Sequence, residues 1–169
     1  MARPVDTNRR TTTLAKAAEY VLEHGLADLS LRPLAKALDT SPRMLLYDFG
    51  SKERLVHEIL AEIRRRERSM LDADVHTLDD VWRWISAPGR TPFLRLFFET
   101  YVAALGRNEA QPFVLDWLAY LQEHWTPPVD TASATLMIAV VRGLLLDLLA
   151  TGDRSRTDAA SRRFGELLG

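Results

Sequence analysis

Apolar residues recur every three or four positions along most of the chain, which is the spacing of amphipathic helices. Glycine, proline and capping residues fall between these periodic segments. The pattern predicts helices over about 8–24, 31–38, 42–49, 52–71, 78–87, 91–106, 111–125, 129–151 and 154–168. No segment of any length alternates apolar and polar residues as a strand does. The sequence therefore predicts an all-α fold of about nine helices.

Two of these predicted helices are short and lie close together, at 31–38 and 42–49. The first has one apolar face, formed by Leu31, Leu34, Ala35 and Leu38. Pro42 stands at the first position of the second, where its missing N–H costs nothing, and Gly50 ends it. The segments that precede the second, third and fourth helices each offer a capping serine, namely Ser30, Ser41 and Ser51. This is the helix-turn-helix pattern, whose second helix enters the major groove of DNA. An ordinary pair of helices inside a bundle has the same appearance.

The first 55 residues or so resemble the DNA-binding domain of TetR/AcrR-type transcriptional regulators. The residues that match are Ala17, Ala18, Gly25, Leu29, Ser30, Leu31, Leu34, Ala35, Ala37, Ser41, Leu45, Phe49, Ser51, Lys52, Glu53 and Leu55. The chain departs from the family at Asp39, where glycine is usual, and at Leu46, where the usual tyrosine is shifted to Tyr47. Aspartate tolerates left-handed backbone better than most residues, so the turn at Asp39 is expected to survive.

The resemblance implies both an organisation and a function. It implies a three-helix, helix-turn-helix DNA-binding domain over 1–50 and a C-terminal effector-binding and dimerisation domain over 51–169, connected by the helix 52–71. It implies a cytoplasmic homodimer that pairs through its last two helices and binds double-stranded DNA. We expect a transcriptional regulator, most simply a repressor that a small-molecule effector releases from a palindromic operator.

DNA recognition is expected from the helix 42–49 and its surroundings. Arg43 is the best candidate for a base contact, because a guanidinium can bind guanine O6 and N7 together. Met44 is placed to touch a thymine methyl. The candidates for phosphate contacts, which position a protein without specifying sequence, are Arg9, Arg10, Arg32, Thr40, Ser41, Tyr47 and Lys52. Each could instead be an ordinary surface residue, and Ser41 could serve only as the helix cap.

The candidates for effector binding lie on the middle helices. They are Trp82, Phe97, Tyr101, Trp117, Tyr120 and, on the long apolar helix, Arg142. As a group they favour an apolar or aromatic effector, although any single aromatic residue is more simply explained as core. Arg142 and Asp147 are unusual in so apolar a helix, and buried charges need partners. Structural pairing is the first expectation for both, ahead of a dimer contact, solvent or a ligand.

Composition narrows the function further. The 169 residues include no cysteine, which excludes disulfides and thiolate chemistry, and the net charge is −1. Residues 1–56 hold nine basic and seven acidic side chains, a weak excess of +2. The longest apolar stretch, 136–150, is interrupted by Arg142 and Asp147, so no membrane span is expected. The N-terminus, with an arm expected over 1–8, lacks the apolar region of a signal peptide.

Enzyme and cofactor motifs are not found in the sequence. His57-Glu58 begins like the helix of a zinc protease, but Ala61 stands where the second histidine is required. No glycine-rich phosphate loop or nucleophile elbow is present. We therefore expect no cofactor, no metal and no enzyme activity.

Two other functions stay open. One is a helical interaction module that has lost DNA binding, suggested by the weak basic excess and by Asp48 in the recognition helix. The other is a small helical-bundle enzyme, suggested only by the aromatic middle helices.

Overall fold

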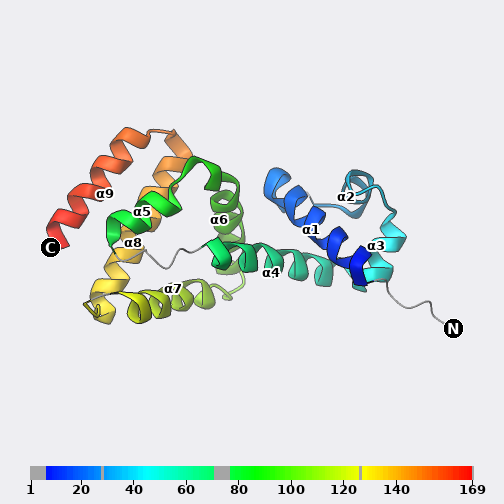
Figure 1. The fold of residues 1–169 in the computed structure, drawn as a ribbon, viewed down its shortest axis with the longest axis horizontal. Coiled ribbons are helices and arrows are strands. Elements are labelled where there is room, and N and C mark those ends of the chain that lie inside the picture. Colours follow the sequence, from blue (N-terminus) through cyan, green and yellow to red (C-terminus); the bar gives the residue numbers. More distant parts are fainter. Residues whose placement is uncertain (1–6, 28, 71–76, 126, 169) are drawn as a thin grey trace. The chain divides into compact units, whose positions relative to one another are not determined.

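The structure is a computed structural model that describes residues 7–27, 29–70, 77–125 and 127–168. Within these residues it contains nine α-helices, one 3₁₀-helix and no β-strand, which confirms the all-α fold predicted from the sequence. In chain order the helices are α1 (Thr7–His24), α2 (Leu31–Ala37), α3 (Pro42–Phe49), α4 (Lys52–Met70), α5 (Leu78–Ile85), η1 (Pro88–Arg90), α6 (Thr91–Leu105), α7 (Gln111–His124), α8 (Thr131–Thr151) and α9 (Arg154–Leu168) (Figure 1). The arm expected over 1–8 and the loop expected over 72–77 fall mostly outside the described residues.

The chain divides into two compact units, residues 1–72 and 73–169. Helix α4 lies in the first unit because α1 and α3 pack against it. Apolar side chains from all four helices form the core of this unit. The most deeply buried of them are Ala17, Ala18, Val21, Leu34, Ala35, Leu45, Phe49, Leu55 and Ile59. This core fixes the orientation of α3, the predicted recognition helix.

The turn between α2 and α3 contains one residue in a left-handed conformation, Asp39, with φ of 51°. Its N–H donates to Lys36 O, and the N–H of Thr40 donates to Ala35 O at 2.9 Å. Aspartate therefore forms the turn at the position where the family pattern that the sequence resembles usually has glycine. Gly50, with φ of 85°, ends α3.

The helix caps agree with the sequence at two of the three predicted serines. Ser41 Oγ accepts a hydrogen bond from Met44 N, and Ser51 Oγ accepts one from Arg54 N, each at 3.2 Å. Ser30 lies at the N-cap of α2 in extended backbone, but its side chain makes no capping hydrogen bond.

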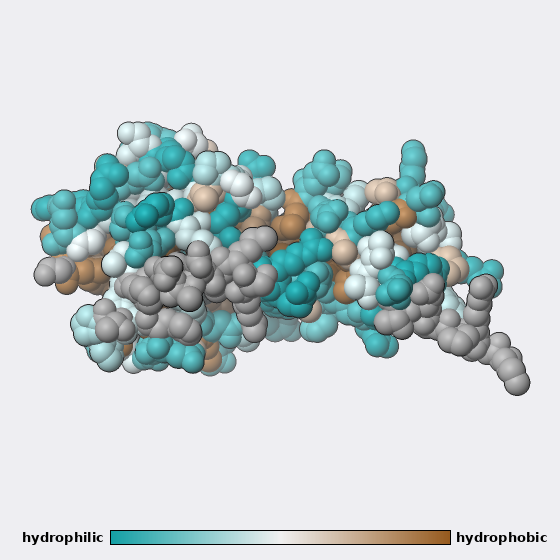
Figure 2. Space-filling view, in the orientation of Figure 1, coloured by the Kyte–Doolittle hydropathy of each residue, from teal (hydrophilic) through white to brown (hydrophobic). Residues whose placement is uncertain are grey.

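The second unit is built around α8, which packs against α6, α7 and α9, while α5 packs against α9. Its core includes Leu94, Phe98, Ala134, Met137 and Leu145. On the face drawn in Figure 2, hydrophilic side chains predominate and apolar side chains form small patches.

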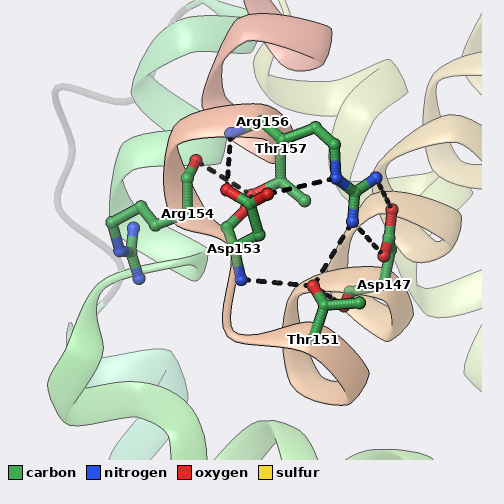
Figure 3. Close-up of polar contacts among 6 residues, drawn as sticks. All are labelled: Asp147, Thr151, Asp153, Arg154, Arg156 and Thr157. Carbon is green, nitrogen blue, oxygen red and sulfur yellow. Dashed lines mark hydrogen bonds and ion pairs between the residues drawn. The ribbon is translucent and has the colours of Figure 1, made fainter.

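The connection between α8 and α9 is held by a cluster of polar contacts (Figure 3). Arg156 binds both carboxylate oxygens of Asp147, at 2.6 and 2.7 Å, and also pairs with Asp153. Gly152, with φ of 69°, gives the chain the left-handed residue that ends α8. These contacts fix the angle at which the last two helices meet.

Candidate nucleic-acid interface

Helix α3 has one buried face and one exposed face. Leu45 and Phe49 are 1% and 2% exposed and anchor the helix in the core. Arg43 and Tyr47 are exposed and lie four residues apart, so they share one side of the helix. Met44 is half-buried between the two faces. A helix that contacts base edges in a major groove needs an exposed polar face near its N-terminus, and α3 has such a face.

Basic residues lie at the starts of the two neighbouring helices. Arg32 is the second residue of α2, and Lys52 is the first residue of α4; both are exposed. Free backbone N–H groups at a helix start also attract anions. Thr40 is half-buried in the turn, and Ser41 is exposed while its hydroxyl caps α3. The structure thus gives Ser41 its structural role, and a phosphate contact by Ser41 stays a prediction.

The two arginines at the start of α1 are engaged with other parts of the first unit. Arg9 pairs with Asp48 at 2.7 Å. Arg10 donates to both carboxylate oxygens of Glu58, at 2.7 and 2.6 Å, and to the backbone carbonyl of Asp48 at 3.1 Å. Its guanidinium also lies 4.7 Å from the ring centre of Phe49. These contacts tie α1 to the end of α3 and to α4, and DNA contact by either arginine stays a prediction.

Asp48 does not belong to the exposed face of α3. Its side chain is 3% exposed and its carboxylate is neutralised by Arg9. The acidic residue that suggested a loss of DNA binding is therefore directed into the protein, where it does not repel phosphate. Similarly, Glu58, part of the incomplete zinc-protease pattern, is occupied by Arg10.

The candidate effector residues of the second unit separate into core and partly buried positions. Trp82 is 4% exposed, and its indole N–H donates to Asp158 Oδ1 at 2.7 Å, which joins α5 to α9. Trp117 and Tyr120 on α7 are half-buried and pack edge to face, with ring centres 6.0 Å apart. Partial burial raises the pKa of Tyr120. Trp82 is thus accounted for as a structural residue.

Phe97 and Tyr101 on α6 form a cluster with Phe113 on α7, which sequence reasoning did not single out. Their ring centres lie 5.7 to 6.1 Å apart. Arg142 on α8 reaches this cluster: Nη2 donates to the Phe113 carbonyl at 2.6 Å, and its guanidinium carbon lies 5.1 Å from the Tyr101 ring centre. Every residue has a backbone carbonyl, so the sequence cannot indicate that this one accepts a hydrogen bond from Arg142.

The two charged residues of α8 have different partners. Asp147 pairs with Arg156 of α9 in the same chain, which is the structural pairing expected from the sequence. Arg142 has no carboxylate partner among the described residues; its guanidinium contacts a backbone carbonyl and an aromatic ring.

Comparison with known proteins gives one family match. Residues 14–59, which run from α1 into α4, match the family described as bacterial regulatory proteins, tetR family. No curated protein sequence matches the chain well enough to count as a relative.

The fold matches solved structures over nearly the whole chain. One is a protein from Rhodococcus sp. described as a TetR-family transcriptional regulator, with a TM-score of 0.64, 18% identity, and coverage of 92% of this chain and 95% of that one. Another is the multidrug binding protein EbrR complexed with imidazole, with a TM-score of 0.62, 24% identity, and coverage of 96% and 93%. EbrR complexed with proflavin matches with a TM-score of 0.60, 22% identity, and coverage of 92% and 98%. At these identities the structures show a common fold.

Proposed function

We propose that this chain is a TetR-family transcriptional regulator that acts as a cytoplasmic homodimeric repressor; the family match of residues 14–59 and the shared fold support this proposal. In this proposal a small-molecule effector releases it from a palindromic operator. The observation that carries the proposal is the exposed face of α3. Arg43 and Tyr47 project from a helix whose opposite face is locked in the core, within the segment that matches the family.

The roles of the residues around α3 follow from their positions. Arg43, in the first turn, contacts a base edge, and Met44 lies beside it for a thymine methyl. Arg32, Thr40, Tyr47 and Lys52 contact phosphates and set the register of the domain on the duplex. Arg9 and Arg10 hold α1 against α3 and α4. The proposal thus assigns sequence reading to α3 and positioning to the residues that flank it.

Pairing of two chains through α8 and α9 is supported by an unpartnered stripe on α8. Five exposed residues with apolar or small side chains follow one another at spacings of three and four: Leu136, Ala139, Gly143, Leu146 and Ala150. A stripe at this spacing is the seam of helices that pack side by side. By length and composition α8 would also pass as a membrane span, a weak test that a core helix of a helical bundle passes as well.

Release by an effector requires two states of the dimer with different affinities for DNA. Half-sites one helical turn apart require recognition helices about 34–36 Å apart. An effector that binds better to a dimer with another separation shifts the population away from DNA by its differential affinity. The aromatic residues of α6 and α7 support an effector site in the second unit, and the similar fold of EbrR was solved with small molecules bound.

The test is selection of bound DNA from a random pool by the full-length chain at near-physiological salt. We expect a palindrome with half-sites about one turn apart. The variant Arg43→Ala should lower the preference for the selected sequence roughly tenfold to a hundredfold, because a bidentate base contact is lost. Arg107→Ala, an exposed change on the second unit, is the control. A folded protein that enriches no motif would contradict the proposal.

The alternative functions predict other outcomes. A helical interaction module would show neither a motif nor the steep salt dependence of phosphate binding. The burial of Asp48 removes one of the two observations that suggested this alternative. A helical-bundle enzyme would turn over a bound small molecule.

A further inference from the structure

Arg142 is a half-buried cation whose charge has no protein counterpart in the described part of the chain. Its guanidinium makes one hydrogen bond, from Nη2 to the Phe113 carbonyl, and lies over the Tyr101 ring. Its Nε is buried and has no hydrogen-bond partner among the residues that the structure describes. Burial lowers the pKa of this guanidinium, and Tyr101 partly opposes the shift. The arginine remains charged, because its ordinary pKa lies so far above neutrality.

A half-buried arginine without an opposite charge destabilises the protein when no ligand is bound. A buried donor without a partner lowers stability, and a charge removed from water lowers it more unless an opposite charge approaches it. Arg156 of α9 shows how this chain neutralises a structural cation, because both of its partner's carboxylate oxygens bind the guanidinium. Arg142 lacks such a partner, which is the pattern of a residue kept for a ligand.

The surroundings of Arg142 define the rest of the ligand. Phe97, Tyr101 and Phe113 come from α6 and α7 and pack their rings together next to the guanidinium. All three are half-buried, so the cluster reaches the surface of the unit. Flat apolar rings beside one cation match a molecule with an aromatic body and a single negative charge.

We propose that Arg142, with Phe97, Tyr101 and Phe113, binds the carboxylate of an aromatic acid. This inference rests on the proposed function, since it names the chemical class of the effector. The carboxylate accepts hydrogen bonds from the guanidinium, including the unused Nε–H, and the aromatic body lies against the three rings. One arginine favours a monoanion, because a phosphate dianion would leave charge uncompensated beside apolar rings.

The test compares acids with their neutral amides on the full-length chain. The probes are benzoate, 2-naphthoate and indole-3-acetate, each paired with its primary amide at pH 7, and binding is measured by titration calorimetry. We expect at least one acid to bind about tenfold to a hundredfold more tightly than its amide, as charge-assisted hydrogen bonds predict. Arg142→Met should abolish that preference while leaving affinity for the amide unchanged within about threefold.

Two further variants test whether the preference for the acid depends on Arg142 in particular. Arg107→Met, which removes an exposed arginine that pairs with Glu109, should keep the preference for the acid. Arg142→Lys keeps the charge but loses the planar fork, so it should retain part of the preference. The proposal is overturned if no acid binds more tightly than its amide, or if the preference persists in Arg142→Met. Should Arg142→Met not fold, the wild-type comparison and Arg142→Lys decide.

Failure of this inference and failure of the proposed function give different results. A protein that selects a palindrome from random DNA and treats acids and amides alike is a regulator without this anion site. A protein that prefers the acids but selects no DNA has the site without the regulatory function.

Discussion

In the first unit, the charged residues Asp48 and Arg10 have structural roles that cannot be read from their positions in the sequence. Asp48 lies in the recognition helix, where a carboxylate would repel phosphate, yet its side chain is buried and paired with Arg9. Arg10 is 48 residues from Glu58 in the sequence, yet it donates to the Glu58 carboxylate and to the backbone carbonyl of Asp48. The contacts of Arg9 and Arg10 therefore hold the recognition helix against α1.

The contribution of Asp48 to stability can be measured directly. Asp48→Asn removes the charge that compensates Arg9 and should lower the free energy of unfolding by about 1–3 kcal/mol. Urea denaturation of the two proteins gives the difference. The matched control is Asp79→Asn, which breaks the exposed pair with Arg83 and should have a clearly smaller effect on stability. Equal effects of the two changes would show that the Arg9–Asp48 pair stabilises the protein no more than an exposed ion pair does.

At the scale of the element, the start of each helix depends on its cap. Helices α2 and α3 are both short and both follow a serine in extended backbone. Only Ser41 uses its hydroxyl, accepting a hydrogen bond from Met44 N. Serine at the N-cap thus stabilises α3 through its side chain, whereas α2 depends on the packing of its apolar face in the core.

This pair of serines gives a controlled comparison. Ser41→Ala should lower the free energy of unfolding by about 1 kcal/mol, because a backbone N–H of α3 loses its partner. Ser30→Ala removes no capping hydrogen bond and should have a clearly smaller effect. Both are read from urea denaturation monitored by helical circular dichroism. A larger loss at Ser30 than at Ser41 would contradict this description of the caps.

At the scale of the whole molecule, the exposed stripe of α8 predicts a second copy of the chain. Leu146, in the middle of this stripe, is 49% exposed in the single chain. Leu146→Glu should convert a dimer to a monomer at micromolar concentration, because a carboxylate in the seam would lose its water without gaining a partner. Sedimentation velocity measures the mass of each variant. The dimer should also be required for tight binding to a palindrome.

The control has the same residue type and the same exposure. Leu115 on α7 is also 49% exposed, and Leu115→Glu should leave the dimer intact. If both changes dissociate the protein, or neither does, then the stripe on α8 is not the pairing surface.

The sequence by itself determined the helices, because helical periodicity, caps and turn residues are local. The bounds that the sequence pattern predicts for α3, 42–49, and for α9, 154–168, are those of the structure, and the residue type of Asp39 is compatible with its left-handed turn. The exposed face of α3 followed as well, since Leu45 and Phe49 had to face the core.

Only the tertiary structure decided which charged residues meet. Arg10 and Glu58 are 48 residues apart in the sequence, and Arg142 reaches the carbonyl of Phe113 across 29 residues. Asp147 and Arg142 share one helix, yet among the described residues only Asp147 has a partner of opposite charge. Charge pairing depends on how distant segments pack and on which donors burial leaves unsatisfied, and no local pattern carries that information.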